Sequence, residues 1–298
     1  MENFKQLAII GPTASGKTSL AIDIAKKQDA YILSLDSLSI YKEIDIVSAK
    51  PTAEERGEIT HFGIDMMQPD MLFNVSTYID LYNKVYKKCQ EDKKNLVIVG
   101  GTSFYLKMLM EGISVTPNIS LETKKKAEIH LQNVEEAHSF MNHIDSLYMS
   151  KIESADYYRI EKALHIYLES GIAPSIYFKN HPPKPIITSN LPIYQIETDK
   201  EVLRGNIVLR TKEMLNNGLI NEITMLEKKY GRAPNCMKAI GIKETLMYLD
   251  GIYDRKTLEE KIITNTARLA KRQKTFNNSQ FAHVTKESIE VLRKILLS

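Results

Sequence analysis

Short apolar runs and amphipathic segments alternate along the first hundred residues. The runs at 7–10, 31–35 and 96–99 have the length and composition of buried strands. Residues 18–27 and 75–91 instead repeat their apolar residues at helical spacing. This alternation predicts an α/β fold, in which helices cover both faces of a parallel sheet. Ligands of such sheets bind beyond the carboxyl ends of the strands.

The pattern changes after about residue 115. Helices rich in Lys, Glu and His fill 120–171, and a proline-rich stretch precedes another strand-like run at 191–198. We therefore predict a helical insertion at 115–188 between the two parts of the α/β core, 1–114 and 189–298. From residue 200 onward the core is expected to be mostly helical.

Composition narrows the class of protein only slightly. The 298 residues are 43% hydrophobic and 26% charged, as in globular proteins, and the net charge of +3 neither requires nor excludes a nucleic-acid partner. Cys89 and Cys236 match no metal-binding spacing, so we expect reduced thiols and a cytoplasmic protein. No apolar run reaches the length of a membrane span, so no membrane association is expected. Nothing in the pattern demands a dimer, and we expect a monomer.

The sequence GPTASGKT at 11–18 matches the phosphate-binding P-loop, and it lies after a strand and before a helix. Its glycines allow backbone N–H groups to surround an anion at the positive end of the helix dipole. Lys17 adds a charge, and Thr18 adds a hydroxyl that can bind magnesium. The motif predicts a P-loop NTPase-like fold and a polyphosphate ligand, without identifying a nucleotide. The phosphate-binding residues are expected to be Gly11, Pro12, Thr13, Ala14, Ser15, Gly16, Lys17 and Thr18.

Two further residues follow strands at the same edge of the predicted sheet. Asp36 can be a magnesium ligand, a general base or a helix cap. Thr102 follows Gly100 and Gly101, which would let a substrate lie close to the backbone, and it can equally cap the next helix. Between these strands, 39–68 contains proline, glycine and broken periodicity, so it is expected to form loops and short helices.

Basic residues in the second half of the chain allow two interpretations. Arg210 can point into a site or lie solvated on a helix surface. Residues 266–276, TARLAKRQKTF, combine Arg268, Lys271 and Arg272 with apolar neighbours, as a track for backbone phosphates or a solvated helix face would. Lys124, in a run of three lysines, allows the same two interpretations.

Taken together, these segments resemble the tRNA dimethylallyltransferases, which attach an isopentenyl group to N6 of adenosine 37 beside the anticodon. The resemblance extends in order along nearly the whole chain and is to the bacterial type, since the zinc-finger extension of eukaryotic relatives is absent. It is carried by GPTASGKT at 11–18, DS at 36–37, AKPT at 49–52, His61 with ID at 64–65, VGGT at 99–102, KAIGIKE at 238–244 and ARLAKRQ at 267–273.

The resemblance implies a role for each candidate of the site. The loop would hold the diphosphate of dimethylallyl diphosphate, with Lys17 and a magnesium ion near Thr18 neutralising its charge. Arg210 would contact the same diphosphate, because a guanidinium suits phosphate oxygens. Asp36 would take the proton from adenine N6, and Thr102 would stand where the two substrates meet.

The partner implied by the resemblance is the anticodon stem-loop of tRNA, with adenosine 37 flipped out of its stack. Ser39, Lys162 and Phe276 stand where many relatives carry glutamine, arginine and tryptophan. The expected tRNA-contacting residues are Asp36, Ser37, Leu38, Ser39, Thr102, Lys124, Tyr158, Arg159, Ile160, Glu161, Lys162, Arg268, Lys271 and Arg272.

Two other functions are compatible with the phosphate loop. An enzyme that prenylates free adenine nucleotides would share the donor site, but it would need neither the insertion nor a basic track. A P-loop kinase for small molecules would bind ATP far more tightly than dimethylallyl diphosphate.

Overall fold

A computed structural model describes residues 5–298 and divides them into two compact units. One unit contains the chain up to Leu109 together with Ile187–Ser298, and the other contains Met110–Ile186. The sequence pattern places these boundaries at 114/115 and 188/189, a few residues later on each side.

The first unit is built on a six-stranded parallel sheet of order β3-β2-β4-β1-β5-β6. The parallel sheet expected from the alternating pattern is therefore present. Its strands are β1 (Gln6–Ile10), β2 (Ala30–Leu35), β3 (His61–Phe62), β4 (Asn95–Gly100), β5 (Ile193–Ile196) and β6 (Thr285–Glu287).

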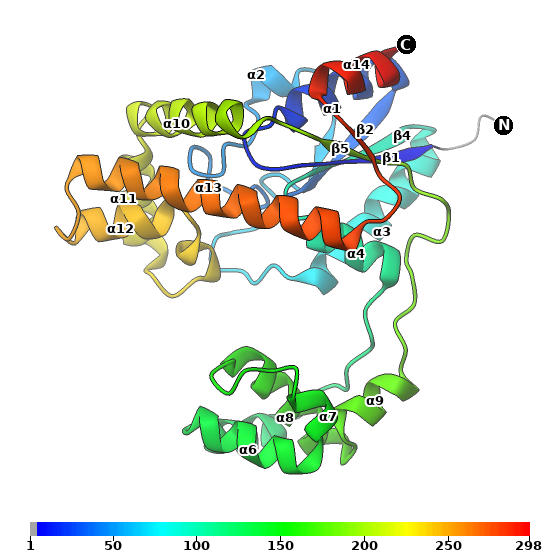
Figure 1. Cartoon of the computed structure of the whole chain (residues 1–298), viewed down its shortest axis with the longest axis vertical. Helices are drawn as coiled ribbons and strands as arrows, with labels where there is room; N and C mark the ends of the chain where they lie inside the picture. The colour runs from blue at the N-terminus through cyan, green and yellow to red at the C-terminus, as the bar shows by residue number, and fades with distance from the viewer. Residues whose placement is uncertain (1–4) are drawn as a thin grey trace. The chain divides into compact units, whose positions relative to one another are not determined.

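Helices cover both faces of this sheet, with α1 and α14 on one and α3 and α4 on the other (Figure 1). The longest helix, α13, packs against α10 and α12. The helices of this unit are α1 (Lys17–Gln28), α2 (Ala53–Arg56), α3 (Val75–Asp92), α4 (Ser103–Glu111), α10 (Lys200–Asn216), α11 (Leu219–Tyr230), η1 (Asn235–Lys238), α12 (Ile242–Leu249), α13 (Arg255–Gln280) and α14 (Ile289–Leu297), of which α4 runs across the boundary between the units.

The core beneath α1 explains why the phosphate loop has a rigid base. Alternate residues of the central strands, such as Ile9, Ile32 and Val97, pack against Leu20 of α1 and Leu292 of α14. All five side chains are almost completely buried. Every second residue of the strands and one face of α1 therefore pack into one apolar layer. This layer holds the end of β1 and the start of α1 on either side of the loop.

Two short strands differ from the sequence expectation. His61–Phe62 pairs in parallel with β2, inside a stretch expected to contain only loops and short helices. Thr285–Glu287 pairs with β5, although all three residues are exposed and no strand was predicted in this mostly helical region. Both strands lie at sheet edges, where two or three residues are too few to show a hydrophobic period.

The second unit is entirely helical, as the pattern over 120–171 predicts. Its core is a cluster around Met141, Met149, Ile160 and Leu164, all fully buried. Its helices are α5 (Leu121–His130), α6 (Val134–Ile144), α7 (Ser146–Met149), α8 (Tyr157–Ser170) and α9 (Pro174–Asn180).

Two observations bear on the expected environment of the protein. Between residues 5 and 298, no helix combines the length and the apolar character needed to cross a membrane. Cys89 and Cys236 are both free and buried.

Candidate active site

Two cavities meet at the carboxyl ends of β1, β2 and β4. The first, of about 370 Å³, is lined by the phosphate loop and by Asp36, and we call it the loop pocket. The second, of about 320 Å³, is lined by Thr102 and several apolar side chains, and we call it the Thr102 pocket. The two pockets share Thr13, Asp36, Ser48, Arg210, Leu269 and Gln273.

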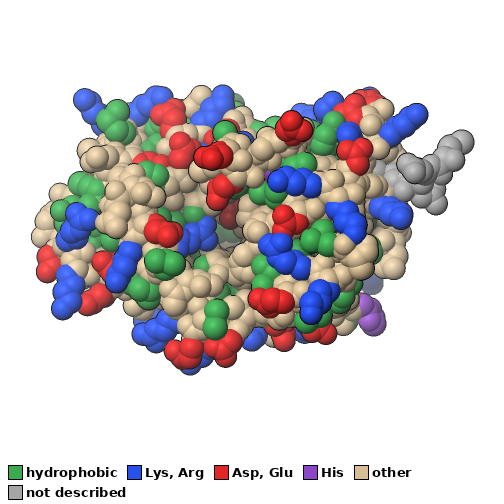
Figure 2. All heavy atoms as spheres, turned by 90° about the horizontal axis from the view of Figure 1, so that it is seen from above, with side chains coloured by type: hydrophobic (Ala, Val, Ile, Leu, Met, Phe, Trp, Pro, Cys, Tyr) green, Lys and Arg blue, Asp and Glu red, His purple; other side chains and the backbone are tan. Residues whose placement is uncertain are grey.

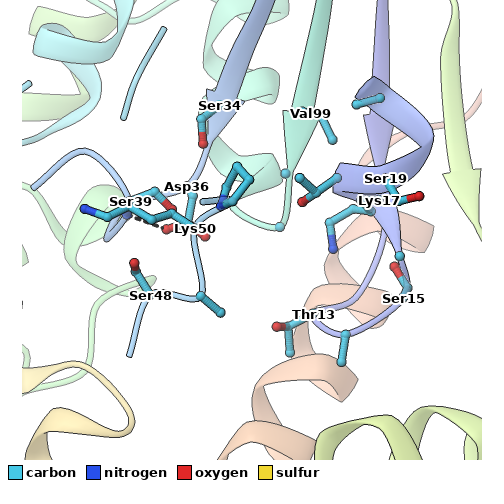
Figure 3. Close-up of a pocket in the computed structure, with 18 of the residues that line it drawn as sticks. Thr13, Ser15, Lys17, Ser19, Ser34, Asp36, Ser39, Ser48, Lys50 and Val99 are labelled. Atoms are coloured by element: carbon cyan, nitrogen blue, oxygen red, sulfur yellow. Dashed lines mark hydrogen bonds between the residues drawn. The ribbon is translucent and has the colours of Figure 1, made fainter. Parts of the chain in front are cut away.

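The phosphate loop forms one side of the loop pocket. Gly16 has a left-handed backbone (φ 80°) at the start of α1, a conformation that favours glycine. Lys17 follows it and donates from Nζ to the carbonyl of Pro12, inside its own loop. In Figure 3, Thr13, Ser15 and Lys17 lie on one side of the pocket, across from Asp36 and Lys50. Thr18, the expected magnesium ligand, is exposed and also lines this pocket.

Two cations converge on the loop pocket. Burial and the charge of Arg210 lower the pKa of Lys17 to about 7, while Asp36 opposes the shift. Burial also lowers the pKa of the Arg210 guanidinium, opposed by the charges of Asp36, Glu213 and Glu55. Arg210 donates to Thr13 Oγ1 at 3.3 Å and to the Ala49 carbonyl at 3.1 Å, both uncharged acceptors. Desolvated cations that share one nearby carboxylate are arranged for an anionic ligand. The alternative of a solvated surface arginine is therefore wrong.

Asp36 stands at the end of β2, where it lines both pockets. Its Oδ1 accepts the backbone N–H groups of Leu38 at 2.8 Å and Ser39 at 2.9 Å. These bonds fix the carboxylate within the turn after β2, so Asp36 caps a turn and not a helix. The other oxygen, Oδ2, has no hydrogen-bond partner among residues 5–298 and is available to a ligand.

Thr102 lies beside β2, because its N–H donates to the Leu35 carbonyl at 2.9 Å. At the start of the following helix, α4, the Thr102 carbonyl accepts the Tyr105 N–H at 3.0 Å. Any residue could make that backbone contact. The threonine side chain therefore has no need to serve as the cap, and Thr102 lines the second pocket.

The two glycines before Thr102 make room for the protein itself, which corrects the expectation that a substrate fills that space. A Cβ at Gly100 would lie 2.3 Å from the Leu35 carbonyl oxygen, and one at Gly101 would lie 2.4 Å from Nε2 of Gln273. Both positions thus serve close packing between neighbouring elements. The glycine pair still borders the loop pocket.

Lys50 of the AKPT segment also lines the loop pocket, but its ammonium group is fully engaged. It donates to the Tyr41 carbonyl at 3.0 Å and pairs with the carboxylates of Asp45, at 2.6 Å, and Asp65. A lysine has three donor hydrogens, so these three acceptors saturate it. Its side chain is 5% exposed. Lys50 therefore stabilises the wall opposite the phosphate loop.

His61 and Gln273 were not selected from the sequence. The His61 Nδ1–H donates to the Ile59 carbonyl at 2.8 Å, and the buried Nε2 has no partner among the described residues. Burial lowers the pKa of this ring, which lines the loop pocket. Gln273 connects the phosphate loop to Gly101. Both belong to segments that carry the family resemblance, and that is the only sequence signal for either.

A third cavity forms a basic groove between α12 and α13. Five cations line it, and among the described residues Glu244 is the only acidic one in its lining. On the face shown in Figure 2, Lys and Arg are instead mixed with Asp and Glu. The groove thus concentrates positive charge that is dispersed on that face. The cations are Lys238, Lys243, Arg268, Lys271 and Arg272, so the three residues expected from 266–276 share one groove.

The residues 37–39 lie on the turn after β2. Ser37 and Leu38 line the Thr102 pocket. Ser39 is 5% exposed and lines the loop pocket, so a ligand can reach its side chain only from within the cavity.

The remaining expected RNA contacts belong to the unit 110–186. Tyr158, Arg159 and Lys162 are exposed along α8, and the Lys162 ammonium lies 5.3 Å from the centre of the Tyr158 ring. Lys124 is exposed on α5, and Glu161 is partly buried. Ile160 corrects the expectation, because its side chain is fully buried in the core of this unit and cannot face RNA.

The sequence and the fold both match known proteins. The model of the family described as IPP transferase matches residues 39–280. The chain is 64% identical over 293 residues to the tRNA dimethylallyltransferase of Sulfurovum sp. (strain NBC37-1), which covers 98% of this chain and 97% of that protein. It is 53% identical, also over 293 residues, to the protein of the same name from Sulfurimonas denitrificans.

Solved structures agree with this assignment. The tRNA isopentenylpyrophosphate transferase of Staphylococcus epidermidis is 30% identical, with a TM-score of 0.69 over 99% of this chain and 96% of that one. A eukaryotic dimethylallyltransferase acting on tRNA shares the fold, with a TM-score of 0.84 at 21% identity over 97% of this chain and 76% of that one. The extent of the family match and the identity to these relatives together show that the chain belongs to the IPP transferase family.

Proposed function

We propose that this protein transfers a dimethylallyl group from dimethylallyl diphosphate to N6 of adenosine 37 in tRNAs that read codons beginning with U. The observation that carries the proposal is the meeting of the two pockets at Asp36 and Arg210. One pocket is cationic and contains a phosphate loop, and the other combines polar side chains, Thr102 among them, with a set of apolar ones. A donor with an anionic head and a short apolar tail fits this pair of cavities, and relatives are named for the same transfer to tRNA.

The diphosphate would lie between the phosphate loop and Arg210. Lys17 and Arg210 are desolvated, with carboxylates near them but not directly paired with them among the described residues, and a bound diphosphate would contact both cations directly. The apolar tail would extend toward the Thr102 pocket, whose walls include Ile207, Met214 and Leu269.

Asp36 is the candidate general base. Its Oδ1 is fixed by two backbone donors, and its Oδ2 can accept a proton. In the proposed step, a bond forms between adenine N6 and C1 of the dimethylallyl group while the bond from C1 to the diphosphate oxygen breaks. The N6 proton passes to Asp36, and diphosphate leaves with the electron pair. A positioned base is useful because the N6 lone pair is delocalised into the ring.

The residues present fit a magnesium ion that is held mainly by the substrate. Among residues 5–298, no group of three or more His, Cys, Asp or Glu side chains could hold a metal ion. Mg²⁺ is commonly bound through one or two protein oxygens plus substrate phosphates and water. Thr18 is exposed in the loop pocket and would provide one such oxygen. When bound, the ion would neutralise charge on the diphosphate.

The tRNA would present adenosine 37 flipped out of its stack at the Thr102 pocket. The basic groove would bind backbone phosphates and set the position of the RNA. Arg159 and Lys162 of α8 and Lys124 of α5 would add contacts from the second unit. We also propose that the protein acts as a monomer in the cytoplasm, since both pockets are built from one chain and both cysteines are free thiols.

The direct test supplies radiolabelled dimethylallyl diphosphate and magnesium with one of two acceptors, an anticodon stem-loop with adenosines at 36–38 or free AMP. We expect label on the stem-loop and none on AMP. Label on AMP alone would establish prenylation of free nucleotides. In a parallel reaction supplied with ATP, hydrolysis or phosphate transfer, together with no labelled RNA in the first reaction, would favour a P-loop kinase.

A further inference from the structure

The side-chain amide of Gln273 joins two loops that leave neighbouring strands. Its Oε1 accepts the N–H of Thr13 at 2.8 Å, and its Nε2 donates to the carbonyl of Gly101 at 3.1 Å. The strands β1 and β4 are adjacent, with Ile10 opposite Gly100. A single amide therefore closes the gap between the phosphate loop and the loop after β4. Gln273 is partly buried and lines both pockets.

Gly101 leaves the room that this amide needs. A Cβ at Gly101 would lie 2.4 Å from Nε2 of Gln273, whereas the next atoms are at 3.3 Å or more. The obstacle is the end of a flexible side chain, so alanine at 101 would displace the amide without breaking the sheet. Gly100 differs, because its Cβ would meet the backbone of Leu35. The second glycine of the pair is thus matched to Gln273.

Thr13 is the loop residue that receives this contact. Its N–H is engaged by Gln273, and its hydroxyl is contacted by Arg210 at 3.3 Å. An N–H that already donates to an amide oxygen is not free for an anion. Anion binding is left to the later N–H groups of the loop and to Lys17. Gln273 therefore fixes the entry of the loop without occupying the anion site.

We infer that Gln273 is a positioning residue, which sets the spacing between the phosphate loop and the end of β4 and so aligns the bound diphosphate with Thr102 and Asp36. The inference rests on the proposed function. Displacements of about 1 Å can slow a reaction by about a hundredfold when two substrates must be aligned. Gln273 directly follows Arg272 on α13, so one helix carries both this amide and a wall of the basic groove.

Three variants and a matched control test the inference. Gln273→Met keeps the length of the side chain but removes both hydrogen bonds, and Gly101→Ala displaces the amide from the opposite side. The third is the double variant. Gln280→Met is the control, since Gln280 lies on the same helix, bonds to Lys107 and Ser279, and lines neither pocket. For each protein we would measure thermal unfolding, affinity for inorganic diphosphate by calorimetry, affinity for the stem-loop, and the single-turnover rate of transfer.

We expect Gln273→Met to slow single-turnover transfer by about tenfold to a hundredfold. Diphosphate affinity should fall by less than the rate does, and stem-loop affinity should stay within about twofold. Gly101→Ala should reproduce this effect, and the double variant should be no slower than the slower single variant, because both changes remove the same contact. Gln280→Met should match the wild type.

Several results would overturn the inference. They are a Gln273→Met rate within twofold of wild type, multiplicative losses in the double variant, or an equal loss in Gln280→Met. A defect confined to stem-loop affinity would also refute it, since Gln273 would then be an RNA contact. Failure of the proposed function would look different, because the wild-type protein itself would not transfer label to the stem-loop.

Discussion

The two walls of the loop pocket each contain a buried lysine, and the two lysines are held in opposite ways. Among residues 5–298, Lys17 makes a single side-chain hydrogen bond, to a carbonyl of its own loop. Lys50 is saturated by one carbonyl and two carboxylates. The phosphate-loop wall is therefore short of negative charge, and the wall of 45–65 is internally neutralised. A cation that lines a pocket is not always available to a ligand. Its availability depends on how many of its donor hydrogens are already bonded to the protein.

This difference assigns the two walls different tasks. In the proposed function, the phosphate loop with Arg210 would bind the anion, and Asp36 would present the base from the side of the pocket that also contains Lys50. A desolvated cation that is not directly paired with a carboxylate destabilises the free protein, and an anion that binds to it offsets that penalty. A lysine whose donors are all bonded within the protein contributes to folding stability and adds little to the affinity for the ligand. Mutations on the two walls should therefore change different measurements.

The largest effect is expected for Asp36→Asn. The amide keeps the size of the side chain but cannot accept the N6 proton, so transfer should slow by about a hundredfold or more. Diphosphate affinity should be unchanged or tighter, because a negative charge near Lys17 and Arg210 is removed. Single-turnover transfer and calorimetry separate the two quantities. A rate within about fivefold of wild type would remove Asp36 from the mechanism.

The pair Lys17→Met and Lys50→Met tests the comparison directly. Lys17→Met should weaken diphosphate binding by about tenfold to a hundredfold, as expected for a hydrogen bond to a charged group, with unchanged or higher stability. Lys50→Met should lower the free energy of unfolding by about 1 to 3 kcal/mol, because it leaves two carboxylates without their cation. This figure is below that of a fully buried pair, since Asp45 and Asp65 are partly exposed.

Calorimetry with inorganic diphosphate and denaturant unfolding check these expectations. If Lys50→Met lost diphosphate affinity as strongly as Lys17→Met while remaining fully stable, the two walls would have the same task. The distinction between them would then be wrong.

Much of this site could be predicted because its parts have local signatures. A phosphate loop between a strand and a helix fixes both its structure and its place at the sheet edge. Asp36 and Thr102 follow strands whose apolar runs are unmistakable, so their meeting at one edge follows from the parallel sheet. Predicting these residues required only the strand and helix periods and the rule for where parallel sheets bind ligands.

The rest depended on contacts between distant segments. Nothing around Lys50 shows that Asp65 and the Tyr41 carbonyl saturate it. Gln273 lies 260 residues from Thr13 and shows no pattern of its own within α13. Ile160 shows the reverse error: it was predicted as an RNA contact because its segment resembles the family, but its side chain packs into the core. Resemblance identifies a segment, and packing decides which side chains of that segment face a ligand.

A smaller effect is expected from pH. The pKa of Lys17 is about 7 in the free protein, so its ammonium is mostly charged below pH 7 and mostly neutral above it. Diphosphate binding favours the charged form, so binding above pH 7 takes up a proton. Affinity should therefore fall between pH 7 and pH 9, by up to about tenfold per pH unit if only the charged form binds.

Lys17→Arg provides the control for this titration. Arginine stays charged throughout the range, so the decline between pH 7 and pH 9 should disappear. Ionisation of the ligand affects both proteins equally and cancels in the ratio of their affinities. If the two proteins lost affinity in parallel, Lys17 would still be fully charged at pH 9, contrary to a pKa near 7.

The smallest effect is expected in the basic groove, outside both walls of the loop pocket. Lys243 and Lys271 lie on opposite sides of the groove and line neither pocket. Their double alanine variant should bind the stem-loop about threefold to tenfold more weakly, and its slope of log affinity against log salt should fall by about 0.7 to 0.9 per lost phosphate contact. At saturating stem-loop the transfer rate should be unchanged.

Lys87→Ala is the matched control, since Lys87 is 79% exposed on α3 and pairs only with Glu91 among the described residues. An unchanged salt slope would mean that these lysines make no phosphate contacts. A loss of rate with affinity intact would mean that the groove acts in the chemical step and not in binding, which would remove the division between the catalytic pockets and the RNA surface.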